Sequence, residues 1–254
     1  MKNVISVLIL LTALAAFSSC AYLQPLVSDF NVVSLPQEIQ IGNEAARQVA
    51  GQMKLSQDAA VTRRVQSLGE KLVQGLPRKE YDYQFYVVED KTPNAFTIPG
   101  GKIYVHTGLL QFAANDDEVA GVIAHEIGHA YMRHPAKLIS RQYGVEVLSN
   151  ILFKGNAAQM KTVALQIAKG SVINYYGRQD EFEADETGFY ILRRAGLSSR
   201  GMLTFFTRLQ TLEQRGSILS ILSSHPPTQE RIVRLQSLEA GTRQPTLVFQ
   251  SLAN

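Results

Sequence analysis

The stretch His125-Glu126-Ile127-Gly128-His129 holds the residue types from which a metal site and a general base can be built. Residues four apart lie on the same face of a helix, so both imidazoles could reach one metal ion. Neutral imidazole suits zinc, and a catalytic zinc site has three protein ligands and one open position. Glu126 follows the first histidine directly and is close enough to act on a water molecule at the metal. The motif therefore predicts a metal-dependent hydrolase.

A third ligand must come from another part of the chain, and a second acidic stretch offers candidates. The segment Arg178–Asp185 is predicted to be helical, so its Glu181 and Asp185 share one face while Glu183 points away. One carboxylate could bind the metal, and the other could accept a hydrogen bond from the free N–H of a ligating histidine. A solvated acidic helix face has the same pattern, so spacing alone leaves both interpretations open.

Together these motifs resemble the HtpX and CAAX-prenyl-protease family of zinc metallopeptidases. The resemblance is closer to its soluble periplasmic and lipoprotein branch, which includes a mitochondrial relative. It extends from Ser34 to Leu238 and also includes the segments Asn94–Phe96, Gly100–Val105, Thr107–Leu110 and His225–Arg231. Gly177 is a departure, because relatives often have Ser or Asn at this position.

The resemblance implies roles for individual residues. His125, His129 and Glu181 are expected to bind one Zn²⁺ ion, and Glu126 is expected to be the catalytic acid and base. Asp185 is expected to accept a hydrogen bond from a ligating histidine. The implied fold is a zincin-like metallopeptidase domain with a small sheet whose edge borders the active-site cleft.

Two further segments are expected to border that cleft. His225 lies in a loop that resembles one lying over the zinc in soluble relatives. There it could bind the zinc, stabilise the oxyanion of the reaction, or serve only the structure of its loop. Asn94, Ala95 and Phe96 are expected to form the sheet edge that pairs with an extended substrate.

Three other polar residues are expected to have lesser roles. His134 is interpreted as a surface or capping residue that is rotated off the metal face. His106 is interpreted as a strand residue, with substrate contact as the alternative. Arg178 is expected either to pair with an acidic neighbour or to orient the carboxylates.

The elements that must position these residues are predicted from helix caps, residue periodicity and strand propensity. Strands are expected at 83–89, 94–98, 102–107 and 246–249, and helices at 34–51, 56–75, 115–129, 136–153, 157–173, 178–195, 199–214 and 228–240. The predicted fold class is therefore α+β and predominantly helical.

The N-terminal residues predict an export signal. Lys2 precedes an apolar run that ends in Ser18-Ser19-Cys20, which is typical of a lipoprotein signal peptide with Cys20 as the lipid attachment site; simple secretion is the alternative. We expect a signal peptide at 1–19, a tether at 20–33 and a metallopeptidase domain at 34–254. Cys20 is the only cysteine among 254 residues, which excludes an intramolecular disulfide and a cysteine-rich metal site.

These observations predict a zinc-dependent endopeptidase that acts on unfolded or misassembled cell-envelope proteins. Its expected location is the periplasmic face of the envelope, on the outer membrane, where a lipid on Cys20 anchors it. The net charge of +3, with scattered basic residues, gives no reason to expect a nucleic-acid partner. The alternative is an envelope-protein assembly chaperone with a latent protease site, and a weaker one is a hydrolase of cell-wall peptides.

Overall fold

The computed structural model describes residues 30–152, 154–170, 176–214, 221, 224–226 and 228–246. The expected signal peptide, Cys20, most of the tether, and residues 247–249 of the expected terminal strand lie outside this part of the chain. Within it, no helix is both long and apolar enough to cross a membrane.

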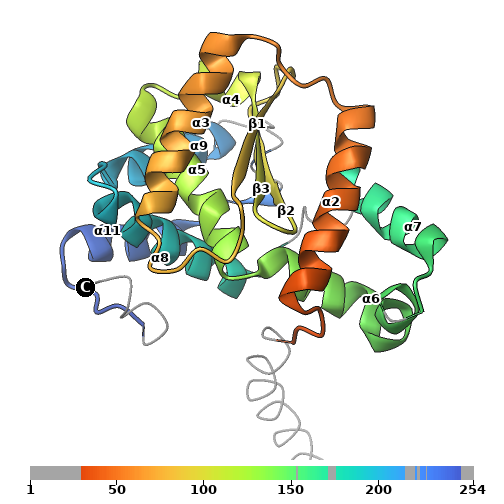
Figure 1. Cartoon of the computed structure of the whole chain (residues 1–254). Coiled ribbons are helices and arrows are strands. Elements are labelled where there is room, and N and C mark those ends of the chain that lie inside the picture. Colours follow the sequence, from red (N-terminus) through yellow and green to blue (C-terminus); the bar gives the residue numbers. More distant parts are fainter. Residues whose placement is uncertain are drawn as a thin grey trace, which may run out of the picture.

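The described residues form an α+β fold dominated by helices, which confirms the predicted fold class (Figure 1). The strands are β1 (Gln84–Val88), β2 (Ala95–Ile98) and β3 (Lys102–His106). The helices are α2 (Leu35–Gln52), α3 (Ala59–Gln74), α4 (Thr107–Phe112), α5 (Asp116–Tyr131), α6 (His134–Leu152), α7 (Ala157–Ala168), α8 (Arg178–Arg194), α9 (Arg200–Gln214) and α11 (Gln229–Glu239).

Several boundaries differ from the sequence prediction for local reasons. Helix α3 begins after Asp58, whose side chain accepts hydrogen bonds from two backbone N–H groups of its first turn, rather than at Ser56. Leu55 forms an isolated antiparallel bridge with Val88, and this pairing keeps the preceding segment extended. Helix α6 begins at His134, two residues early, and is kinked at Gly144, where φ is 67°.

The sheet has the strand order β1-β3-β2, with β1 parallel and β2 antiparallel to β3. Phe85 lies opposite Ile103, and Phe96 lies opposite Tyr104. Strand β2 is therefore an edge strand, and no other described segment pairs with it.

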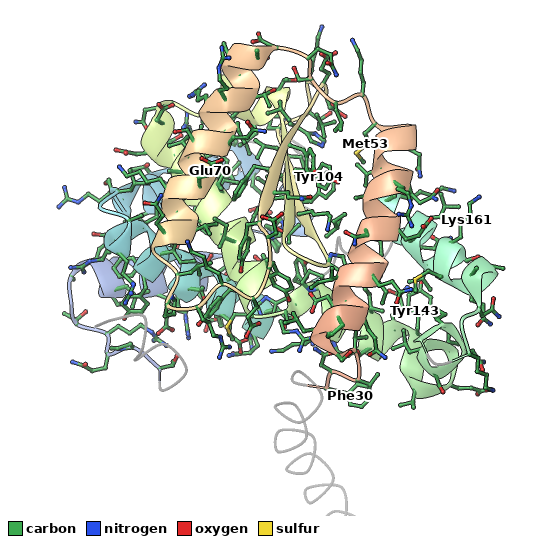
Figure 2. All side chains as sticks on the ribbon, in the orientation of Figure 1. Phe30, Met53, Glu70, Tyr104, Tyr143 and Lys161 are labelled. Carbon is green, nitrogen blue, oxygen red and sulfur yellow. The ribbon has the colours of Figure 1, made fainter. Side chains whose placement is uncertain are left out.

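Both faces of this sheet are covered, as Figure 1 shows for α3 and α2 on its two sides. Successive side chains of a strand point to opposite faces. Ile103 and Val105 pack into a core with α3, α5, α8, α9 and α11, whereas Tyr104 packs into a second core with α2, α6 and α7. Tyr104, labelled in Figure 2, is stacked between the rings of Tyr86 and Phe96. Two-sided burial explains why every residue of β2 and β3 is buried.

Helix α5 is the central element of the larger core, where it packs against α3, α8, α9 and the sheet. Asn115 caps its N-terminus by accepting a hydrogen bond from the backbone N–H of Glu118. Its close crossing with α8 depends on Gly128, because a Cβ atom there would lie 2.6 Å from the carbonyl oxygen of Ala184. The two helices that carry the predicted metal ligands are thus held at backbone contact.

Replacing Gly128 with alanine is expected to lower the free energy of unfolding by about 1–3 kcal/mol, because the added methyl group would force α5 and α8 apart. Urea unfolding followed by circular dichroism would measure this change. Gly51→Ala in α2 is the matched control, since no atom lies within 4 Å of its added Cβ. Alanine favours a helix over glycine, so the control is expected to be as stable as wild type or more stable. Equal stability of the two variants would contradict the close α5–α8 packing.

Candidate metal centre

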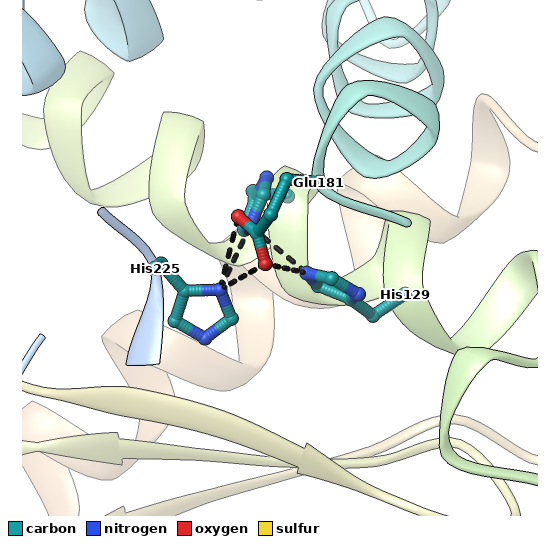
Figure 3. A group of neighbouring side chains, drawn as sticks. His129, Glu181 and His225 are labelled. Carbon is teal, nitrogen blue, oxygen red and sulfur yellow. Dashed lines mark hydrogen bonds and ion pairs between the residues drawn. The ribbon is translucent and has the colours of Figure 1, made fainter. Parts of the chain in front are cut away.

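Four buried side chains converge beside the sheet: His125 and His129 from α5, Glu181 from the first turn of α8, and His225 from the segment after α9. Each offers one ligand atom, and these four atoms all lie within 4.8 Å of one another. Figure 3 shows His129, Glu181 and His225 pointing toward a common centre. The structure thus brings together residues that are 100 positions apart in the sequence.

The donor set of this cluster fits a metal ion. His125 Nε2 lies 3.0 Å from His129 Nε2 and 3.2 Å from His225 Nδ1, while Glu181 Oε1 lies 3.0 Å from His225 Nδ1. A neutral imidazole has one N–H group and one lone pair, so three ring nitrogens facing one another cannot all be satisfied by sharing protons. A cation would accept all the lone pairs, and nitrogen with carboxylate oxygen is a set that zinc binds.

Arg231 of α11 compensates the negative charge of the site. It is 1% exposed, with Nη1 2.7 Å from Glu181 Oε2 and Nη2 2.7 Å from Asp185 Oδ1. Burial alone would raise the pKa of Glu181, but the charges of Arg231 and His225 hold that pKa well below its usual range. Glu181 is therefore ionised, which is the form that binds a metal. Nη1 of Arg231 also donates to the backbone oxygen of Pro226, next to His225.

The ring nitrogens that point away from the cluster lie close to other polar side chains. His125 Nδ1 lies 2.9 Å from Asp185 Oδ1. His129 Nδ1 lies 2.9 Å from His134 Nδ1, and His134 Nε2 lies 3.1 Å from Glu183 Oε2. Burial lowers the pKa of His129 well below its usual value, which favours the neutral imidazole that a metal requires.

The placement of His134 corrects the sequence interpretation, which made it a surface or capping residue. It is fully buried and contacts His129 directly. Helix α5 ends at Tyr131, and Arg133 then adopts φ of 57°, in the left-handed region. Because of this left-handed residue, the His134 ring lies against the His129 ring. Helical spacing alone does not predict this contact.

Glu126 lies between the cluster and the sheet. It is buried, and its Oε2 accepts a hydrogen bond of 2.8 Å from Thr97 Oγ1 of β2. Its other oxygen, Oε1, lies 3.5 Å from His225 Nε2. The carboxylate expected to act as general base is therefore oriented by a hydroxyl group of the edge strand.

The predicted substrate-binding segment lies at the same edge. Ala95 and Phe96 belong to β2 and are buried, with Phe96 stacked on Tyr104 rather than pointing to the cluster. Asn94 precedes the strand, and its side-chain oxygen is buried without a hydrogen-bond partner among the described residues. The residues of β2 are buried as a whole, with Ala95 and Ile98 0% exposed and Thr97 1% exposed, so this edge is covered in the described arrangement.

Other polar residues lie apart from the cluster. His106 is buried with Nδ1 3.1 Å from the backbone oxygen of Thr92, as a strand residue. Arg178 is exposed, and its Nη1 lies 3.7 Å from Glu230 Oε2. This contact agrees with the expected pairing with an acidic neighbour. A cavity of about 380 Å³ lies between α2 and the α6–α7 region, and none of its lining residues belongs to the cluster.

The sequence analysis missed the functions of two residues beside the cluster. Arg231 was noted only as part of a resemblance, although a buried acidic pair such as Glu181 and Asp185 requires a cation nearby. Tyr176, two residues before α8, stacks on the His129 ring with centroids 3.9 Å apart. Its position just before the acidic helix was the only available signal.

Comparisons with known proteins place the chain in a family. A model described as peptidase family M48 matches residues 59–239. The β-barrel assembly-enhancing protease of Escherichia coli (strain K12) is 29% identical over 233 residues, which cover 87% of this chain and 47% of that protein. Metalloprotease YcaL of the same strain is 28% identical over 195 residues, 75% of each chain.

A mitochondrial protein is also similar. The mitochondrial metalloendopeptidase OMA1 of Schizosaccharomyces pombe is 29% identical over 213 residues, which cover 82% of this chain and 62% of that protein. The chain spans about half the length of the E. coli β-barrel assembly-enhancing protease that it matches. Because the family model extends from the start of α3 to the end of α11, the chain belongs to peptidase family M48.

Proposed function

We propose that this chain is a zinc-dependent endopeptidase that hydrolyses peptide bonds of unfolded or misassembled cell-envelope proteins. The observation that carries the proposal is the convergence of three histidine ring nitrogens and Glu181 beside the buried carboxylate of Glu126. Membership of a peptidase family supports the reaction. The name of the E. coli relative, a β-barrel assembly-enhancing protease, supports envelope proteins as the substrate class.

His125, His129 and Glu181 would hold the zinc ion, a set of two histidines and one glutamate that catalytic zinc sites use. A bound zinc ion supplies a Lewis acid that polarises the scissile carbonyl and makes water more acidic. Arg231 keeps Glu181 ionised. Asp185 and His134 fix the orientation of the two imidazole rings through the nitrogens that face away from the site.

Glu126 is the acid and base of this mechanism. Its carboxylate takes a proton from the attacking water and then gives it to the leaving amine. The hydrogen bond from Thr97 holds one carboxylate oxygen, so the other, Oε1, faces the cluster. The reacting bond must therefore lie between Oε1 and the ring nitrogens of α5.

The substrate would pair in extended form with the edge of β2 that no described segment occupies, beginning at Asn94, Ala95 and Phe96, once this buried edge is uncovered. Pairing with an edge strand uses main-chain hydrogen bonds, and side chains of the bound chain contribute mainly through pockets. Because the side chains of β2 are buried, this edge would select for an available backbone. Unfolded chains meet that requirement, whereas folded proteins do not.

His225 would occupy the position that a catalytic zinc site keeps open. Its Nδ1 lies 3.0 Å from Glu181 Oε1, a separation that two ligand atoms of one ion can have, and its ring is buried. In this proposal the described arrangement would be a closed state of the enzyme. The same closure favours a second candidate function, an assembly chaperone whose protease site is latent, because a closed site can still bind client proteins.

We further propose that residues 34–254 form the peptidase domain, tethered by 20–33 to a lipid on Cys20 after removal of residues 1–19. Diacylated cysteine with an acylated amino group would anchor the chain firmly, since more than one acyl chain is needed for stable binding. This would place the enzyme on the periplasmic face of the outer membrane, with the membrane and envelope proteins as its partners.

Replacing Glu126 with glutamine is expected to lower the rate of casein hydrolysis by about 10²–10⁴-fold, because the amide cannot accept the proton of water. Zinc content, measured by atomic absorption on the same sample, should stay at one ion per chain. Full proteolysis with zinc bound would contradict the mechanism. Growth complementation by this variant, equal to that of wild type in a deletion strain, would instead favour the chaperone function.

Replacing His134 with alanine is expected to weaken zinc binding by about 10–100-fold, because His129 loses the group that orients its ring. Competition with a chromophoric chelator would measure the dissociation constant. His106→Ala is the matched control, since His106 is also buried but contacts no residue of the cluster. Equal zinc affinity of the two variants would show that His134 does not support the metal.

Replacing His225 with alanine is expected to raise peptide turnover severalfold, because it frees the position that this side chain fills. Hydrolysis of a fluorogenic unstructured peptide at saturating zinc would measure the change. Loss of turnover with zinc retained would contradict closure and would instead indicate that His225 stabilises the oxyanion.

A further inference from the structure

Tyr176 lies over the metal cluster immediately before α8. Its ring is nearly parallel to that of His129, with an angle of 18° between the planes and 3.9 Å between the centroids. The same ring lies 5.8 Å from His225 and 6.0 Å from His134, measured between centroids. It therefore forms one wall of the site that the two histidines of α5 open onto.

The stacking of this ring requires no hydroxyl group, yet the hydroxyl oxygen of Tyr176 is buried. It has no hydrogen-bond partner among the described residues. A buried hydroxyl group without a partner is destabilising, and a buried tyrosine usually has a partner for its O–H. Such an exception calls for an explanation, and a partner that arrives with the substrate supplies one.

The surroundings of the hydroxyl group define what it can do. A phenolic hydroxyl group carries its proton at neutral pH and can donate one hydrogen bond. A hydroxyl group on a ring that lies against His129 and His225 can donate a hydrogen bond to a group that arrives with the substrate.

We propose that Tyr176 is a further catalytic residue of the peptide hydrolysis proposed above, donating a hydrogen bond from its hydroxyl group to the scissile carbonyl oxygen as that oxygen becomes negative. The phenolic proton stays on Tyr176 throughout, so no additional proton acceptor is needed. A donor that is already in place and poorly solvated stabilises such a charge more than water does. This role accounts for both the buried hydroxyl group and the missing partner.

This inference rests on the proposed function and can be tested with a single-atom change. Tyr176→Phe keeps the ring that stacks on His129 and removes only the donor. Tyr83→Phe is the matched control, because the Tyr83 hydroxyl is also buried without a partner in the described structure, but its ring contacts Tyr81 rather than the cluster. Both variants are compared with wild type as zinc-loaded enzymes.

The first measurement is steady-state hydrolysis of a fluorogenic unstructured peptide. Tyr176→Phe is expected to lower kcat by about 10²-fold, in the range for loss of one oxyanion donor, with KM and the zinc dissociation constant unchanged. Tyr83→Phe should retain wild-type values. A weakened zinc affinity in Tyr176→Phe, or a change in KM alone, would overturn the inference, because either result indicates a structural or ground-state role.

The second measurement is a binding experiment that does not depend on turnover. Calorimetry is used with a phosphinic version of the same peptide, whose tetrahedral phosphinate imitates the transition state. In Tyr176→Phe its dissociation constant should rise by about 10–100-fold. The parent peptide, measured with Glu126→Gln present to prevent hydrolysis, should bind equally with and without the Tyr176 hydroxyl group.

The outcomes separate this inference from the proposed function. If wild type hydrolyses the peptide and Tyr176→Phe matches it in kcat and phosphinate binding, only the role of Tyr176 is wrong. If wild-type enzyme loaded with zinc neither hydrolyses peptides nor binds the phosphinate, the proposed function is wrong, and the role of Tyr176 is wrong with it.

Discussion

The site depends on one buried guanidinium group. Glu181 and Asp185 lie one turn apart on α8, both buried, and each ionised carboxylate in such a place costs several kcal/mol unless an opposite charge compensates it. The planar group of Arg231 contacts both, with two of its nitrogens on Asp185 and one on Glu181. It also rests on the Phe206 ring, 4.4 Å from its centroid. Helix α11 thus contributes a residue to the candidate metal centre.

Most of the other residues of the site are positioned by α5 and α8. Helix α5 carries both histidines and Glu126, and α8 carries Glu181 with Asp185, so one helix crossing sets most of the distances. That crossing is close because Gly128 has no side chain. Relative movement of these two helices would change the ligand set and the contact that orients His125 at the same time.

Local patterns predicted the parts of the site that lie within single helices. The spacing of His125 and His129, and that of Glu181 and Asp185, follows from helical geometry, and the structure has helices at both places. His134 was misjudged because its position depends on one left-handed residue, Arg133, whose conformation the residue type does not reveal. Arg231 and Tyr176 contact residues of other elements. The spacing of residues in one sequence does not indicate such contacts. Residue periodicity also does not predict how the helices pack against the sheet and bury both of its faces.

The burial of β2 on both faces has a consequence for how a bound chain is aligned. If the proposed pairing forms at this edge, no side chain of β2 would lock the register of the bound chain, because all of them are buried. A chain paired with this edge could shift by two residues and recover the same hydrogen bonds. Successive peptide bonds of one client would then come into reach of Glu126 by sliding, without release of the chain.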